Sequence, residues 1–187
     1  REAILDAAVV EIARRGFYQT TVAMIARRAG VADGTIYLYF RNKEDVLFSL
    51  FERAMDRFVA EGRAGLDTAG RATGKLRHII ELHLRLVGQD RDLAIITQVE
   101  LRHSLHFMDQ LSRSKVGEYL ELIGRIVAQG QEEGDFRPEL DPVFAAKAVF
   151  GVHDEMATDW VLSQRNTRLE SRAGETMDFL TAALGVR

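Results

Sequence analysis

The sequence predicts an all-α protein, and three observations support this fold class. Apolar residues recur three or four positions apart along almost the whole of the 187-residue chain. No segment shows the strict alternation of apolar and polar residues that is typical of a half-buried strand. Residues that cap helices stand at the ends of the periodic stretches. The contents of hydrophobic residues (47%) and charged residues (28%) are close to the average of globular proteins, which argues against a disordered chain.

The first forty residues predict three helices. An apolar stripe opens the chain and comprises Ile4, Leu5, Ala8, Val9 and Ile12. Two arginines followed by Gly16 form a stop for this first helix. The hydroxyl of Thr20 or of Thr21 caps a second helix over residues 22–28, and a turn that contains a glycine follows it. The third helix is short and is expected over residues 32–39.

The remainder of the chain predicts longer helices. Asn42 is the expected N-cap of the first of them, because Asp45 stands three residues later. The segment from Gly62 to Gly74 is rich in Gly, Ala and Thr and is expected to be a connector. The other expected elements are a helix from Leu76, a short buried helix over 93–101 that begins at Asp92, a long helix from near Ser104 to Gly130 or Gly134, a helix opened by Asp141 and Pro142, and a last helix with Leu169, Met177, Leu180 and Leu184.

The second and third helices predict a helix-turn-helix, because a three-residue turn with a glycine joins two short helices. Gly30 supplies the positive φ that the turn requires. Ile25, Val31 and Ile36 are placed to form the small core between the helices. The residues expected to face outward are Asp33, Gly34, Thr35, Tyr37, Leu38 and Tyr39. Phe40, in contrast, is expected to pack beneath the next helix.

The outward residues have the chemistry of a surface that binds DNA. The hydroxyl groups of Thr35 and Tyr39 suit hydrogen bonds to phosphates, and Lys43 offers a positive charge to the same groups. Leu38 offers an apolar contact to a thymine methyl group. Tyr37 is long enough to reach the DNA backbone or a base edge.

The charge of the chain is distributed unevenly. Residues 1–43 carry seven basic and four acidic side chains, a net +3, which leaves −6 for the rest of a chain whose total is −3. A positive segment ahead of a negative one is typical of a DNA-binding domain fused to a domain that does not contact DNA. The absence of cysteine excludes disulfides and thiol chemistry and suits the cytoplasm. No apolar run reaches the ~20 residues that span a bilayer, so no membrane partner is expected.

The N-terminal residues resemble the TetR family of transcription regulators. The resemblance lies in residues 21–26 (TVAMIA) and 29–46 (AGVADGTIYLYFRNKEDV). It implies about nine helices, arranged as an N-terminal three-helix head and a C-terminal antiparallel helical bundle. It also implies a homodimer and repression that a small ligand relieves. The implied phosphate contacts are Thr21, Thr35, Tyr39 and Lys43, and the implied base or sugar contacts lie near Asp33, Gly34, Tyr37 and Leu38.

One position departs from the family pattern. Ala32 stands where the family often has a serine that caps the third helix. Asp33 is then the candidate for the capping role, which would reduce its use as a base contact.

Residues 1–45 are expected to form the DNA-binding domain, and residues 46–187 the ligand-binding and dimerisation domain. Apolar side chains with a few polar groups among them suit a hydrophobic anionic small molecule, and these polar groups are His83, Gln98, Arg102, His106 and His153. The predicted ligand-binding residues are His83, Leu84, Val87, Gln98, Leu101, Arg102, His106, Phe107, Tyr119, Ile123, Phe150 and Trp160. Cations placed to meet phosphates at the mouth of such a site are Arg77, Arg102, His103, Arg113 and Lys115. The alternative is that most of the apolar set is ordinary bundle core.

Three segments, residues 31–40, 93–102 and 150–160, resemble one branch of the TetR family. The branch represses fatty-acid degradation and responds to long-chain acyl-coenzyme A. The resemblance implies this thioester as the effector, with no resident cofactor and no metal. Two other interpretations are a TetR-type repressor that senses another hydrophobic drug or metabolite, and a helical-bundle enzyme. The enzyme is disfavoured, because Glu100 and His103 have the Glu-x-x-His spacing of a di-iron site without the second copy that such a site needs.

The last two helices are the expected dimer interface. They carry apolar residues on more than one face, and Gly151, Ala157 and Ala183 allow close approach. One helix-turn-helix contacts few base pairs, whereas two on a palindromic operator, ~34 Å or a multiple apart, read enough of them for specificity. The alternative is that these helices only close the core of the monomer.

Overall fold

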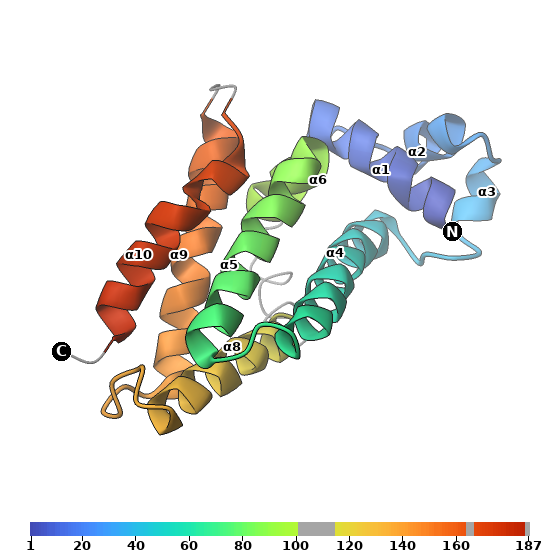
Figure 1. Ribbon diagram of the computed structural model, residues 1–187. Helices are drawn as coiled ribbons and strands as arrows, with labels where there is room; N and C mark the ends of the chain where they lie inside the picture. Colours follow the sequence, from blue (N-terminus) through green and yellow to red (C-terminus); the bar gives the residue numbers. More distant parts are fainter. Residues whose placement is uncertain (101–114, 164–166, 186–187) are drawn as a thin grey trace.

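The computed structural model describes residues 1–100, 115–163 and 167–185, and these residues confirm the all-α prediction (Figure 1). They form nine α-helices and one 3₁₀ helix. The one β-type contact among these described residues is an isolated antiparallel bridge between Phe136 and Gly185. The elements are α1 (Glu2–Arg15), α2 (Val22–Ala29), α3 (Asp33–Ile36), α4 (Lys43–Leu66), α5 (Ala72–Gln89), α6 (Arg91–Gln98), α8 (Lys115–Glu132), α9 (Pro142–Leu162), the 3₁₀ helix η2 (Leu169–Arg172) and α10 (Ala173–Leu184).

The molecule has two regions, which we call the head (α1 to α3) and the body (α5 to α10 together with the second half of α4). The head lies at one end, and α4 leads from it into the body (Figure 1). Helices α9 and α10 run antiparallel along the side of the body away from α4 (Figure 1). The head also packs on the body directly, because α1 contacts α6.

The caps of the head follow the sequence closely. The structure selects Thr21 as the cap of α2, since its Oγ1 accepts a hydrogen bond of 3.3 Å from the backbone N–H of Met24. The hydroxyl of Thr20 instead donates to the carbonyl oxygen of Gly16 at 2.9 Å. Gly30 has the expected left-handed conformation, with φ 70° and ψ 30°. These three positions fix the geometry of the turn before α3.

Helix α3 is shorter than predicted. It ends at Ile36, and the residues up to Tyr39 form turns in which the N–H of Tyr39 and that of Phe40 both donate to the carbonyl oxygen of Ile36. This arrangement directs Ile36 and Phe40 into the core, where they are buried. The expectation that Asp33 caps α3 is wrong, because Ala32 is the N-cap residue and no side chain caps the helix.

The predicted connector from Gly62 to Gly74 is wrong at both ends. Helix α4 continues to Leu66 and α5 begins at Ala72, so the connection is only residues 67–71. Gly62 is inside α4, where a Cβ would lie 3.2 Å from Cδ1 of Ile79 and 3.3 Å from Cδ2 of Leu122. The small residue allows α4 to approach α5 and α8, so it is a packing residue rather than a loop residue.

Most remaining helix ends agree with the sequence. Asn42 caps α4, accepting a 2.8 Å hydrogen bond from the N–H of Asp45. Asp141 caps α9 and Pro142 is its first residue. Helix α8 ends at Glu132, just before Gly134 with its φ of 75°, so the second of the two predicted stops is the one that the structure uses.

Three details of the predicted helices differ from the structure or lie outside the described residues. The cap of α6 is Asp90 rather than Asp92, the last predicted helix is divided into η2 and α10, and the start predicted near Ser104 lies outside the described residues.

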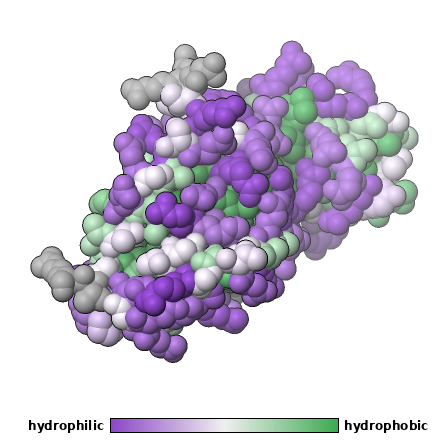
Figure 2. All heavy atoms as spheres, in the orientation of Figure 1, coloured by the Kyte–Doolittle hydropathy of each residue, from purple (hydrophilic) through white to green (hydrophobic). Residues whose placement is uncertain are grey.

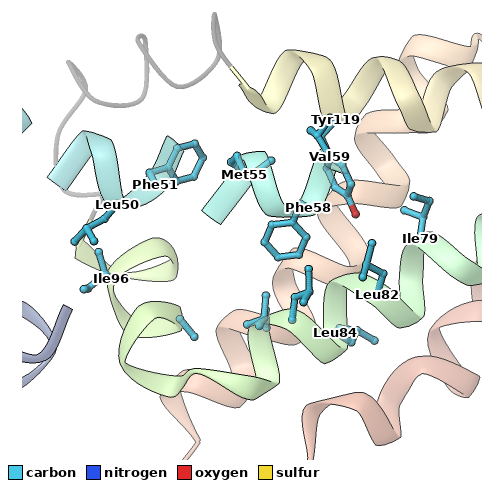
Figure 3. Close-up of a cluster of buried hydrophobic side chains, with 14 of the residues drawn as sticks. Leu50, Phe51, Met55, Phe58, Val59, Ile79, Leu82, Leu84, Ile96 and Tyr119 are labelled. Atoms are coloured by element: carbon cyan, nitrogen blue, oxygen red, sulfur yellow. The ribbon is translucent and has the colours of Figure 1, made fainter. Parts of the chain in front are cut away.

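The core of the body is built from large apolar side chains of several helices (Figure 3). Phe58 and Val59 of α4, Ile79 and Leu82 of α5 and Tyr119 of α8 are all buried there. On the face drawn in Figure 2, hydrophilic residues cover most of the surface. No helix of the described part of the chain combines the length and the apolar character needed to cross a membrane.

Candidate DNA-binding surface and ligand site

Three consecutive large side chains form an exposed surface on the head. Tyr37 is 58% exposed, Leu38 79% and Tyr39 52%, whereas their neighbours Ile36 and Phe40 are 1% and 2% exposed. Asp33 and Gly34 are also exposed, and Thr35 is half-buried. Exposed contiguous apolar area is typical of a binding surface rather than of a core. The fold therefore presents the predicted DNA-contacting residues of this segment together.

Lys43 has a structural role that the sequence did not indicate. Its ammonium donates to the carbonyl oxygens of Phe17 at 2.7 Å and of Thr20 at 2.9 Å. It also lies 4.2 Å from the centre of the Phe17 ring, which is a cation–π contact. Two of its three N–H groups thus attach the start of α4 to the linker between α1 and α2, which leaves one for a phosphate.

Glu11 connects two helices of the head. Its carboxylate accepts hydrogen bonds from Nε of Arg28 at 2.6 Å and from Nε of Arg15 at 3.1 Å. The hydrogen bond from Arg28, followed by that from Arg15, holds the pKa of Glu11 below its ordinary value against the opposing effect of burial. The network stabilises the packing of α1 on α2, which positions the surface that follows.

A hydrogen bond joins the head to the body. The backbone N–H of Phe17, in the linker between α1 and α2, donates to Oε2 of Glu100 at 2.9 Å. Glu100 follows α6, so this bond attaches a helix of the body to the linker that Lys43 also holds. The sequence offered no signal for this pair, because the two residues are 83 positions apart.

A buried cluster of rings lies inside the body where the ligand site was predicted. The rings of His83 on α5 and His153 on α9 have centres 4.1 Å apart. The hydroxyl of Tyr119 on α8 lies 3.4 Å from Nδ1 of His83. Phe58 stacks on His83 with a centre distance of 4.8 Å, and Phe150 meets His153 edge-on at 5.5 Å. We call these five residues the ring cluster; Figure 3 shows Phe58 and Tyr119 within the core.

The ring cluster contains polar atoms without partners. Nε2 of His83 and both ring nitrogens of His153 are buried and have no hydrogen-bond partner among the residues that the structure describes. Burial lowers the pKa of His83 to about 3. Burial, and the nearby ring of His83, lower the pKa of His153 well below its usual value. Burial also raises the pKa of the Tyr119 hydroxyl, so all three groups are uncharged near neutral pH.

The structure brings some predicted ligand residues together and separates others. His83, Tyr119 and Phe150 meet in the ring cluster, while Leu84, Val87 and Ile123 are buried in the same bundle. His153 was noted in the sequence among the polar groups of this wall, and Phe58 is added by the structure. The predicted residues Leu101, Arg102, His106 and Phe107 lie outside the described residues, as do His103 and Arg113.

Gln98 and Trp160 lie elsewhere. Gln98 accepts a 3.0 Å hydrogen bond from the hydroxyl of Thr158. Trp160 is ten residues beyond Phe150 in the same helix, which is about 15 Å along its axis. Its indole N–H donates to the carbonyl oxygen of Thr167 at 2.7 Å, and Trp160 lines a separate pocket of about 300 Å³ near the end of α9.

Two of the cations predicted at the mouth of the site already face carboxylates. Nζ of Lys115 lies 2.9 Å from Glu118 and 3.1 Å from Asp56. Arg77 lies 4.0 Å from Glu81. Phosphates that approach these cations would compete with exposed ion pairs, which are weak.

Comparisons with known proteins agree with the fold and with the position of the head. The family "Bacterial regulatory proteins, tetR family" matches residues 4–50, and the family "YsiA-like protein, C-terminal region" matches residues 51–183. The chain is 38% identical over 181 residues to the fatty acid metabolism regulator protein of Bacillus subtilis (strain 168), which covers 97% of this chain and 93% of that relative.

Two solved structures are similar over nearly the whole chain. The fatty acid degradation regulator FadR from Bacillus halodurans is 39% identical, with a TM-score of 0.92 and coverage of 98% of each chain. The transcriptional regulator FadR from Bacillus subtilis, in complex with stearoyl-CoA, is 36% identical, again with a TM-score of 0.92 and 98% of each chain covered. These relatives are regulators and not enzymes, which confirms the prediction that the chain is not an enzyme. The chain belongs to the TetR family and is a DNA-binding transcription regulator.

Proposed function

We propose that this protein is a homodimeric repressor of fatty-acid degradation genes that a long-chain acyl-coenzyme A releases from its operator. The observation that carries the proposal is the similarity, over 98% of both chains, to a regulator whose structure contains stearoyl-CoA. The ring cluster supports a ligand site at the position that the sequence predicted in the body. The exposed surface at Tyr37 to Tyr39 supports a separate contact with DNA.

The head suits a major groove. Leu38, the most exposed of the three large residues, is available to a thymine methyl, and the phenol of Tyr37 to the DNA backbone or a base edge. Tyr39 and Thr35 offer hydroxyl donors to phosphates. The Oγ1 of Thr21 accepts from the N–H of Met24, so its own hydroxyl hydrogen remains available to a phosphate.

The division into domains at residue 45 falls inside the first turn of α4, so this helix belongs to both parts.

Helices α9 and α10 supply the proposed dimer interface. Val143, Phe144 and Leu162 of α9 and Phe179 of α10 are large apolar residues that the monomer leaves exposed. The two helices lie side by side at the edge of the body, away from α4 (Figure 1). A two-fold axis across this face would bury the same patch on both subunits. Two heads would then contact the two halves of a palindromic operator.

The ligand acts on the heads through the body. A ligand among α5, α8 and α9 shifts α5, and this shift reaches the head through the continuous helix α4. The hydrogen bond between Glu100 and the N–H of Phe17 provides a second route, from α6 to the linker of the head. Either movement changes the separation of the two heads, so that both no longer fit the operator. Identical head separations with and without ligand would contradict this mechanism.

The proposal is tested by fluorescence anisotropy on duplex DNA from the region upstream of the protein's own gene. Stearoyl-CoA is titrated into the complex, with octadecanoate as the control ligand and a scrambled duplex as the control DNA. We expect binding to the upstream duplex alone and release by the thioester alone. Binding that ignores the thioester would refute the fatty-acid assignment and leave a TetR regulator of another hydrophobic effector. Equal binding to both duplexes would refute a specific operator in that region.

A further inference from the structure

We propose that His83 and His153 form an uncharged hydrogen-bonding site that recognises the carbonyl oxygen of a neutral acyl derivative, a thioester or an ester, and rejects a free carboxylate. The inference rests on the proposed function, because it assigns the polar contact within the proposed ligand site. It goes beyond that function by naming the atoms that distinguish one acyl compound from another.

The two imidazoles have unused hydrogen-bonding capacity. A neutral imidazole has one N–H donor and one acceptor nitrogen. In His153 both ring nitrogens lack a partner among the described residues, so its N–H is available in either tautomer. In His83 the hydroxyl of Tyr119 lies 3.4 Å from Nδ1, and Nε2 has no partner. Buried polar atoms are paired in most native structures, so three such atoms in one cluster point to a partner that arrives from outside.

The described side chains that pack on the two imidazoles are aromatic and mostly apolar. Phe58 stacks on His83, and Phe150 meets the His83 ring edge-on at 6.1 Å. The Tyr119 hydroxyl is the one other polar group of the ring cluster. A partner that fits these walls is mostly hydrocarbon and carries an isolated hydrogen-bonding oxygen. A long-chain acyl group with its carbonyl has this composition.

The absence of charge in the ring cluster decides which acyl compound fits. Helices α4, α5, α8 and α9 contribute to it Phe58, His83, Tyr119, Phe150 and His153, none of which is charged near neutral pH. Among the residues that the structure describes, no counter-charge in the ring cluster would compensate a carboxylate for its lost hydration, which is strongly unfavourable. A thioester carbonyl is neutral and needs only one donated hydrogen bond, which an imidazole N–H supplies.

The experiment compares three ligands by isothermal titration calorimetry on the intact protein without DNA. They are stearoyl-CoA, its S-octadecyl-CoA thioether, in which a CH₂ group replaces the carbonyl, and octadecanoate. We expect the unaltered protein to bind the thioester about tenfold more tightly than the thioether, which is the typical worth of one hydrogen bond. Octadecanoate is expected to bind more weakly than either. Equal affinities for thioester and thioether would overturn the inference without the use of any variant.

The variants assign the effect to the histidines. His153→Phe and His83→Phe remove ring nitrogens and retain an aromatic ring, and we expect at least one of them to reduce the preference for the thioester to less than about threefold. His78→Phe, the same change on α5 outside the ring cluster, is the matched control and should keep the full preference. A full preference in both cluster variants would overturn the inference. No binding of either coenzyme A compound would overturn the proposed function, and the inference with it.

Discussion

The head and the body hold their functional residues in opposite ways. In the head, Tyr37, Leu38 and Tyr39 are consecutive in sequence and exposed to solvent. In the body, the ring cluster brings residues of α4, α5, α8 and α9 together, and His83 and His153 are buried within it. A surface made by one short segment can change without loss of the fold, whereas a buried cluster made by four helices contributes to stability and to function at once.

The largest expected effect is on the free energy of unfolding, and it should distinguish the buried residue Phe40 from its exposed neighbour Tyr39. Phe40→Ala removes a ring that is 2% exposed, so the free energy of unfolding should fall by about 3–5 kcal/mol. Tyr39→Ala, one residue earlier, should change it by less than about 0.5 kcal/mol, because this ring is half exposed. Urea denaturation followed by circular dichroism measures both values. Similar losses in the two variants would break the distinction between surface and core in this segment.

The next effect concerns the DNA-binding surface alone. The double variant Tyr37→Ala, Tyr39→Ala should lower the affinity for the operator about 100-fold, since each lost contact to a base or a phosphate is worth about 1–2 kcal/mol. Its melting temperature and its affinity for stearoyl-CoA should stay close to those of the unaltered protein. Fluorescence anisotropy measures the first property and calorimetry the other two. An unchanged operator affinity would show that DNA is bound elsewhere.

The buried imidazoles predict a dependence of stability on pH. Burial lowers the pKa of His83 to about 3 in the folded protein, against about 6.5 in the unfolded chain. The unfolded state therefore takes up the proton first as the pH falls, and folding loses stability from about pH 6.5 downward. Between pH 7 and pH 5 this residue should cost about 2 kcal/mol of unfolding free energy.

The variant His83→Phe isolates this contribution. Urea denaturation at pH 7, 6 and 5 should show a loss of stability that is smaller in the variant than in the unaltered protein by about 2 kcal/mol. Equal losses in the two proteins would mean that His83 takes up its proton between pH 7 and pH 5 as readily in the folded protein as in the unfolded chain. The ring cluster would then carry a charge in this range.

The smallest effect tests the contact between the two regions. Glu100→Ala removes the acceptor of the hydrogen bond from the N–H of Phe17. Stearoyl-CoA weakens operator binding by a certain factor, and we expect this factor to be about five times smaller in the variant. Glu100→Gln should largely preserve this factor, because its amide oxygen can still accept the bond. Anisotropy with and without ligand gives the factor for each variant. If Glu100→Ala keeps the whole factor, the coupling runs through α4 alone.

The comparison also explains how much of the molecule could be predicted from its sequence. The N-caps Thr21 and Asn42 and the turn glycine Gly30 act on atoms at most a few residues away, so a local sequence pattern contains all the information. The first apolar stripe likewise predicted residues of α1 that are buried, among them Ile4, Leu5 and Ile12. Gly62 was misinterpreted because a glycine of a connector and a glycine of a tight helix contact have the same composition, and only the contact with Ile79 separates them.

Contacts between distant segments were not predictable in this way. The hydrogen bonds from Phe17 to Glu100 and from Lys43 to the linker before α2 depend on how whole helices pack. The meeting of His83 with His153 depends on the packing of α5 against α9, so the sequence could name both residues without predicting that their rings touch. The separation of Trp160 from Phe150, in contrast, is local, because ten residues of one helix extend about 15 Å along its axis.

The most direct test of the account is the reciprocity of the two sites. Calorimetry gives the affinity for stearoyl-CoA of the free protein and of the protein saturated with its operator, and anisotropy gives the affinity for the operator with and without stearoyl-CoA. If the buried site of the body and the exposed surface of the head are coupled, each ligand weakens the other by the same factor. An affinity for stearoyl-CoA that the operator leaves unchanged would contradict the coupling on which the proposed repressor depends.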